Sequence, residues 1–117
     1  MIGTPSQYKQ SKLVGLHSPT SLEPGEYFMN LDGVASLWVK KYKGSYIIRD
    51  LFVLPEYRSK GYGKKLIVGI TEFLKPKNLP IHLYVHPSND IAIKLYKNNG
   101  FVFLKNTALG DKFTYKS

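Results

Sequence analysis

The sequence has 117 residues, 43% hydrophobic and 21% charged, which argues against a disordered chain and fits one domain over residues 1–117. It contains no cysteine, and this excludes a disulfide scaffold, a thiolate zinc site and an acyl-cysteine intermediate. The formal net charge of +9 favours anionic partners such as nucleic acid, acidic proteins or a phosphate-rich cofactor.

No apolar run approaches the roughly 18 residues that span a bilayer. Residues 1–10 also lack the apolar stretch of a secretory signal. We therefore expect a cytoplasmic protein with no membrane partner. The basic residues are scattered from Lys9 to Lys116, which is weaker evidence for nucleic-acid binding than one basic stripe would be.

The first half of the chain predicts an antiparallel meander. Residues 1–25 contain three prolines and little apolar material, so we expect an irregular arm there, with room for one short strand near residues 12–16. Three β-prone runs follow, with turn residues between them: residues 26–30, 34–42 and 46–54.

The second half changes period. Apolar residues at helical spacing predict an amphipathic helix over residues 63–75, which Pro76 ends. A strand is expected over residues 81–85, and a second helix begins at Ser88-Asn89-Asp90 and ends before Gly100. Two further strands are expected over residues 101–104 and 113–115. The order βββαβαββ gives an α+β fold in which the strands flanking the first helix are parallel neighbours.

The stretch from Asp50 to Lys64 carries the strongest chemical signal. It predicts a strand, a basic glycine-rich turn and the start of a helix. Such a turn presents unpaired amide groups at the positive end of a helix dipole. Gly61 and Gly63 would let a phosphate approach the backbone. We interpret the segment as a pyrophosphate-binding turn, the plainer alternative being a basic turn with solvated lysines.

Two better-known phosphate motifs do not fit this segment. The dinucleotide fingerprint fails because Leu66 stands at its third glycine. The P-loop fails because Arg58 stands at its first glycine and Lys65 at its Ser or Thr.

Arg58 to Gly63 reads R-x-x-G-x-G, and Asn89 to Phe101 reads N-x-x-A-x-x-L-Y-x-x-x-G-F. Together, and in this order, the two motifs resemble the GNAT superfamily of acetyl-CoA-dependent N-acetyltransferases. The resemblance covers residues 46–104. Members usually have two helices between their first and second strands, which we do not find here, so the chain resembles a small, N-terminally reduced member.

The resemblance implies a GNAT-like fold with a splayed parallel strand pair, opening near Leu54 and Val85 to admit acetyl-CoA. It implies that the main chain of Leu51, Phe52 and Val53 binds the pantetheine arm and polarises the thioester carbonyl. The cofactor-binding residues that it implies at the turn and second helix are Arg58, Ser59, Lys60, Gly61, Tyr62, Gly63, Lys64, Asn89 and Tyr96.

Tyr96 would also protonate the departing thiolate. Plainer alternatives are a core tyrosine for Tyr96, a helix cap for Asn89, a partly exposed packing residue for Tyr62 and a core residue for Trp38.

The general base is open. Relatives often place a glutamate where this sequence has Arg49 or Tyr84. The candidates are Asp50, His82 and His86, the histidines acting through water. On a strand over residues 81–85, His82, Tyr84 and His86 share one face. No metal site is expected, because His82 and His86 would lie about 13 Å apart.

We therefore expect an N-acetyltransferase that transfers an acetyl group from acetyl-CoA to a primary amine of a small molecule or protein, by direct attack in a ternary complex. The alternatives are a catalytically inactive acyl-CoA-binding sensor and, less favoured, a basic nucleic-acid-binding protein. An exposed sheet edge leaves a homodimer open.

Overall fold

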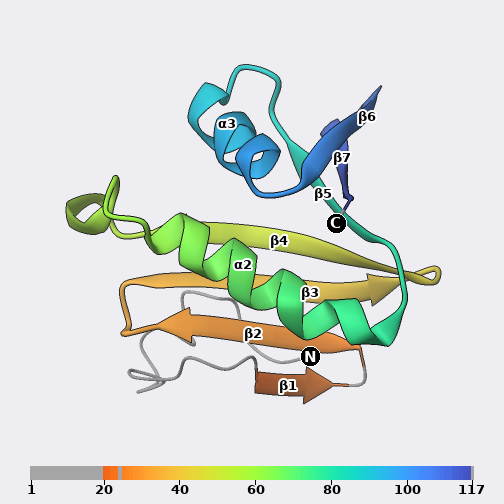
Figure 1. The fold of residues 1–117 in the computed structure, drawn as a ribbon, viewed down its shortest axis with the longest axis horizontal. Helices are drawn as coiled ribbons and strands as arrows, with labels where there is room; N and C mark the ends of the chain where they lie inside the picture. The colour runs from red at the N-terminus through yellow and green to blue at the C-terminus, as the bar shows by residue number, and fades with distance from the viewer. Residues whose placement is uncertain (1–19, 24, 117) are drawn as a thin grey trace.

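The computed structural model describes residues 20–23 and 25–116, which form one mixed sheet with two α-helices on it (Figure 1). The strands are β1 (Thr20–Glu23), β2 (Glu26–Leu31), β3 (Ala35–Tyr42), β4 (Ser45–Val53), β5 (Ile81–Val85), β6 (Phe101–Thr107) and β7 (Gly110–Tyr115). The helices are α2 (Tyr62–Leu74) and α3 (Asp90–Asn98), with 3₁₀ turns η1 (Pro55–Tyr57) and η2 (Lys75–Lys77).

Strands β2 to β4 form the antiparallel meander that the sequence predicts, and β1 adds a fourth strand to it. At residues 20–23 the expectation of an irregular arm is wrong, because β1 pairs there with β2 and the chain turns at Gly25, whose φ is +80°. The polar, proline-flanked sequence Thr20–Glu23 has little strand signal of its own, and pairing with β2 supplies its main-chain partners. The short strand expected near residues 12–16 lies outside the described residues.

Helix α2 covers one face of the sheet, lying across β2, β3 and β4 (Figure 1). Its side chains at helical spacing are fully buried: Leu66, Ile67, Ile70 and Leu74. They pack against the residues of the meander that face them, chiefly Met29, Leu37, Val39 and Ile48. The predicted α+β class is confirmed. Helix α2 ends at Leu74, one residue before the predicted end, and Pro76 lies in the 3₁₀ turn η2 that follows.

The second half follows the predicted order, with longer final strands. Strand β5 has the predicted bounds, and its three buried residues are Ile81, Leu83 and Val85. Gly100 ends α3 with a φ of +93°. Strands β6 and β7 extend to a tight turn at Ala108-Leu109 because their main chains pair from Phe101↔Tyr115 to Thr107↔Gly110, with one register shift between Phe103 and Lys105.

Strand order across the sheet is β1-β2-β3-β4-β5-β7-β6. Every neighbouring pair is antiparallel except β4 and β5, which flank α2 and run parallel. Among the described residues, neither helix is long and apolar enough to cross a membrane. The single parallel pair marks the place where the two halves of the sheet meet.

Candidate functional site: a parted strand pair and an uncapped helix

Strands β4 and β5 pair over only part of their length. Their register contains Tyr46↔Ile81, Ile47↔His82 and Ile48↔Leu83, whereas β4 runs on to Val53 and β5 to Val85. The splayed pair is therefore present, and it opens earlier than the expected position near Leu54 and Val85. Beyond Ile48, β4 still pairs with β3 on its other side, so the edge facing β5 is left without strand partners.

The predicted strand, turn and helix follow directly. After Val53 the chain passes through η1 and enters α2 at Gly61, which is the N-cap residue. Gly61 makes no side-chain capping bond. The first amide groups of an α-helix have no partner within the helix, so those of Tyr62, Gly63 and Lys64 are available to a ligand at the positive end of the helix dipole.

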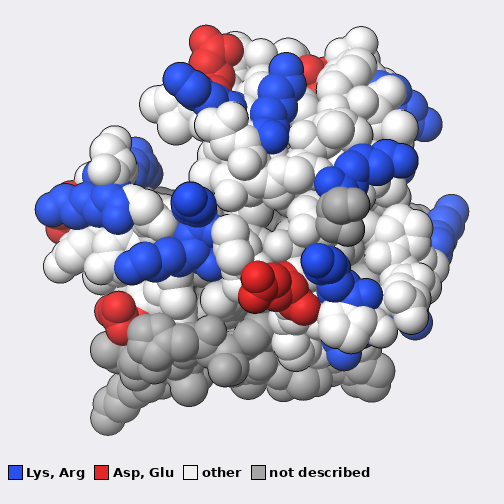
Figure 2. Space-filling model, in the orientation of Figure 1, with Lys and Arg blue, Asp and Glu red and all other residues white. Residues whose placement is uncertain are grey.

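Basic side chains surround this helix start. Figure 2 shows Lys and Arg gathered over the turn and the first half of α2. Lys60, Lys64 and Lys65 are exposed there, and the Lys65 Nζ lies 5.4 Å from the centre of the Tyr62 ring. Tyr62 is half-buried and its ring meets that of Tyr57 edge-on at 5.9 Å, so a packing role accounts for its contacts.

Glycine is required at Gly61 and at Gly63 for different reasons. Gly61 has a φ of +87°, and a Cβ there would meet nothing within 4 Å, so its backbone conformation is what requires glycine. A Cβ at Gly63 would lie 3.1 Å from the Leu95 Cδ2 atom of α3. Gly63 therefore lets α2 and α3 approach each other. Ser59 also has a positive φ, +63°, which folds the turn tightly.

Arg58 links this turn to the strand before it. Its Nε–H donates to the main-chain carbonyl of Val53 at 3.0 Å, and its guanidinium carbon lies 5.9 Å from the centre of the Phe52 ring. The arginine of the R-x-x-G-x-G motif thus contacts the end of β4, where the pantetheine contacts are expected. Leu51 and Val53 pack against the core and Phe52 is partly exposed.

Tyr96 lies in α3, and Asn89 is the N-cap residue of that helix. Tyr96 is 8% exposed and packs edge-on against Phe101. Burial raises the pKa of its phenol above the ordinary value, so it stays protonated at neutral pH, as a proton donor must. Asn89 caps the helix, its side-chain oxygen accepting from the Ala92 amide at 3.2 Å.

A β-bulge shapes the middle of β4. The register passes from Trp38↔Arg49 to Ser36↔Phe52, so Asp50 and Leu51 together face Leu37. Asp50 has a φ of +55°. Successive strand residues normally point to opposite faces, but the bulge breaks this alternation, and Arg49 and Asp50 both line one cavity.

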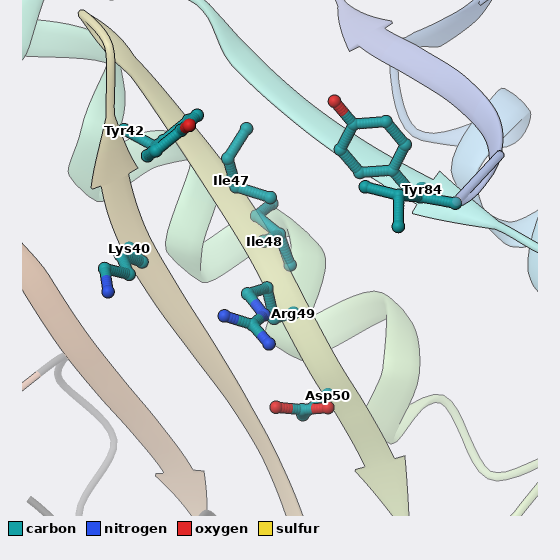
Figure 3. Close-up of a pocket in the computed structure, with 8 residues that line it drawn as sticks. Lys40, Tyr42, Ile47, Ile48, Arg49, Asp50 and Tyr84 are labelled. Carbon is teal, nitrogen blue, oxygen red and sulfur yellow. The ribbon is translucent and has the colours of Figure 1, made fainter. Parts of the chain in front are cut away.

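This cavity has a volume of about 560 Å³ and spans β3, β4, β5 and the β6–β7 turn. It is lined by Lys40, Tyr42, Ile47, Ile48, Arg49, Asp50, Tyr84 and Leu109. Figure 3 shows Lys40, Arg49 and Asp50 in this order along the strands, with Tyr84 on β5 across from Ile47 and Ile48. Sequence reasoning missed Lys40, Tyr42 and Leu109. Alternation along β3 puts the first two on the face of Trp38, and nothing local points to Leu109.

The candidate bases separate in the structure. Asp50 lines the cavity. His82 is half-buried, its Nδ1 is buried without a hydrogen-bond partner, and burial together with Lys112 lowers its pKa. His86 is exposed beyond the end of β5, and its Nδ1 lies 2.7 Å from the Ser88 hydroxyl. Of the three, Asp50 alone lines the cavity beside the parted strands.

Known proteins resemble this chain in sequence and in fold. The family model described as Acetyltransferase (GNAT) family matches residues 17–101. A spermidine N(1)-acetyltransferase of Thermoplasma acidophilum is 38% identical over 52 residues, which are 44% of this chain and 32% of that protein. The chain thus spans about a third of the curated relative that it matches.

Solved structures extend the likeness to the fold. The PaiA N-acetyltransferase of Thermoplasma acidophilum, in complex with coenzyme A, aligns with a TM-score of 0.67 at 23% identity, over 79% of this chain and 60% of that one. An acyl-CoA N-acyltransferase from Klebsiella pneumoniae, described as putative, aligns with a TM-score of 0.70 at 16% identity, over 93% and 82%. With a family model that matches residues 17–101, most of its length, this chain belongs to the GNAT acetyltransferase family.

Proposed function

We propose that the protein is an acetyl-CoA-dependent N-acetyltransferase that acts on a primary amine. The observation that carries the proposal is the junction of two features: the β4 edge that β5 leaves open after Ile48, and the uncapped start of α2 at Gly61. Arg58 joins them through its bond to Val53. An extended chain ending in a diphosphate matches both features at once.

The residues present fit coenzyme A. The amides of Ser59 to Lys64 would hold the pyrophosphate, with Lys60, Lys64 and Lys65 adding charge. The main chain of Leu51, Phe52 and Val53 would bind the pantetheine arm as an added strand. The side-chain oxygen of Asn89 caps α3, and its amide nitrogen would donate a hydrogen bond to the pantetheine arm.

When bound, acetyl-CoA supplies an acetyl group activated as a thioester. A main-chain amide of β4 would hold the carbonyl oxygen, whose negative charge grows as the amine attacks. Asp50 would take the proton that the attacking ammonium must lose, and Tyr96, kept neutral by burial, would give a proton to the departing sulfur. With no cysteine in the chain, the amine attacks directly in a ternary complex.

The test combines binding and turnover. Coenzyme A should raise the melting temperature, and acetyl-CoA with a panel of primary amines should release free thiol only when an amine is present. Initial rates at varied concentrations of both substrates should give intersecting double-reciprocal lines, as a ternary complex requires. The proposal would be overturned if coenzyme A did not stabilise the protein and no amine caused thiol release.

A non-catalytic acyl-CoA sensor is the second candidate, favoured by Arg49 standing where relatives often carry a glutamate. Stabilisation by coenzyme A with no thiol release from any amine would select it. A cytoplasmic location and a homodimer stay predictions from the sequence.

A further inference from the structure

The cavity beside the parted strands lies on the sheet face opposite α2. Residues paired across antiparallel strands share a face, and the pairs Lys40↔Ile47 and Trp38↔Arg49 alternate with the buried residues Val39 and Ile48 that pack against the helix. An acceptor in this cavity would therefore approach β4 from the side away from α2.

The lining carries two cations and one carboxylate. Lys40 and Arg49 are diagonal neighbours on β3 and β4, and both are exposed. Among the described residues, no hydrogen bond or ion pair engages either side chain. A third cation, Lys112, lies 5.8 Å from the centre of the ring of Tyr84, which lines the cavity.

The carboxylate stands at one end of this arrangement. Asp50 is three residues beyond Ile47, the partner of Lys40, a separation of about 10 Å along a strand. It directly precedes Leu51, whose main chain is expected to bind the thioester. Figure 3 shows the order Lys40, Arg49, Asp50 along the sheet.

Apolar and aromatic groups form the rest of the wall. Tyr42 and Leu109 are largely exposed, and both line the cavity with Ile47 and Tyr84. Exposed apolar side chains around a concave site are typical of a surface that contacts a ligand. The end of the cavity away from Asp50, where Tyr42, Ile47 and Tyr84 lie (Figure 3), therefore suits an apolar or aromatic group.

We propose that the acceptor is a primary amine that also carries an anionic group, such as a carboxylate, and an apolar or aromatic body. Asp50 receives the amine beside the parted strands, and Lys40 and Arg49 receive the anionic group. This rests on the proposed function and gives its substrate class. A polyamine, positive at every position, would meet Lys40 and Arg49 with like charge, so the substrate named for the spermidine acetyltransferase relative is disfavoured here.

The test uses two amines that differ by one group. 4-(2-Aminoethyl)benzoate carries a carboxylate across an aromatic ring from its amine, and 2-phenylethylamine lacks the carboxylate. Acetylation should be about tenfold more efficient in kcat/KM for the first, as one charge-assisted contact can supply. Spermidine should be the poorest of the three.

Variants locate the effect. Arg49→Gln and Lys40→Gln should each reduce at least threefold the ratio of kcat/KM for the carboxylated amine to kcat/KM for 2-phenylethylamine. Lys75→Gln, an exposed charge at the far end of α2, is the control and should leave the preference intact. Melting temperature with and without coenzyme A shows that each variant is folded and retains the cofactor site.

The outcomes separate the two proposals. If coenzyme A stabilises the protein but no thiol is released, calorimetry with the coenzyme A complex measures the affinity for each amine. Tighter binding of the carboxylated amine that is lost in Arg49→Gln would support the anion site in the absence of catalysis. Equal use or binding of the two amines, preference for spermidine, or a preference that survives both cavity variants would overturn the inference.

Discussion

Arg58 donates its Nε–H to the main-chain carbonyl oxygen of Val53 at 3.0 Å. The bond joins the last residue of β4 to the residue that opens the basic turn, so the main chain expected to bind pantetheine and the amides expected to bind pyrophosphate are held in one geometry. Arg58 is exposed, and its contact with the Phe52 ring adds little stability to the fold.

Arg58→Lys should therefore weaken coenzyme A binding about fivefold and hardly change the melting temperature, because lysine keeps the charge but not the Nε–H that Val53 accepts. Calorimetric titration with coenzyme A measures the affinity. Arg49→Lys, the same exchange at an exposed arginine outside the basic turn, is the control and should leave the affinity for coenzyme A unchanged. An affinity equal to wild type in Arg58→Lys would show that charge alone matters.

Gly61→Ala should cost about 1 kcal/mol of stability, because alanine is strained at a φ of +87°, and should also weaken coenzyme A binding. Gly44→Ala is a matched control: Gly44 has a φ of +78° and equally open surroundings, in the turn between β3 and β4. Both variants should melt a few degrees below wild type. Equal coenzyme A affinity in the two would contradict a binding role for the Gly61 turn.

Tyr96→Phe should lower kcat at least tenfold while leaving coenzyme A affinity within about twofold, because the ring against Phe101 is kept and only the proton donor is lost. Stopped-flow or steady-state thiol release measures kcat. Unchanged kcat would leave Tyr96 as a core tyrosine only.

Tyr96 also predicts how stability changes at alkaline pH. Since burial raises its pKa in the folded state, its neutral form contributes fully below the unfolded value near 10 and that contribution is lost as pH rises through the folded pKa. Wild type should therefore lose more stability than Tyr96→Phe above about pH 10. Parallel melting curves of the two proteins across this range would contradict it.

His82 predicts that stability falls as the pH is lowered, the opposite pH dependence from that of Tyr96. Burial and Lys112 lower the pKa of His82. Within the described part of the chain, its buried Nδ1 has no hydrogen-bond partner that would stabilise the protonated ring. The neutral form is favoured on folding, so its contribution is present above the unfolded value of about 6.5 and is lost as pH falls through the folded pKa.

Thermal melts between about pH 5 and pH 8 should show a smaller acid loss in His82→Gln than in wild type. His86→Gln, at an exposed histidine, is the control and should follow wild type. An acid loss in His82→Gln as large as in wild type would contradict a role for His82.

Much of the fold follows from periodicity and local chemistry. Strand β5 has the predicted bounds because its apolar and polar residues alternate strictly and Pro80 and Pro87 flank it. Asn89 caps α3 as its residue type and position predict. The strand, turn and helix from β4 to α2 could also be predicted, since glycine and basic residues separate two segments with strong hydrophobic patterns.

What the sequence could not supply depends on pairing between distant segments. Aspartate has no strong preference that would reveal a bulge at Asp50, and only the register against β3 makes it. Lys40 and Leu109 reach one cavity because β3, β4 and the β6–β7 turn converge there. Gly63 looked like a phosphate contact, and its approach to Leu95 becomes visible only when α2 and α3 are packed.

The most direct measurement is an amide NMR titration of the isotope-labelled protein with coenzyme A. The largest shift changes should fall on the amides of Ser59 to Lys64 and of Leu51 to Val53, the two stretches that meet where β5 diverges. Changes confined to scattered lysines such as Lys75 and Lys77, with both stretches unmoved, would contradict a cofactor site at the start of α2.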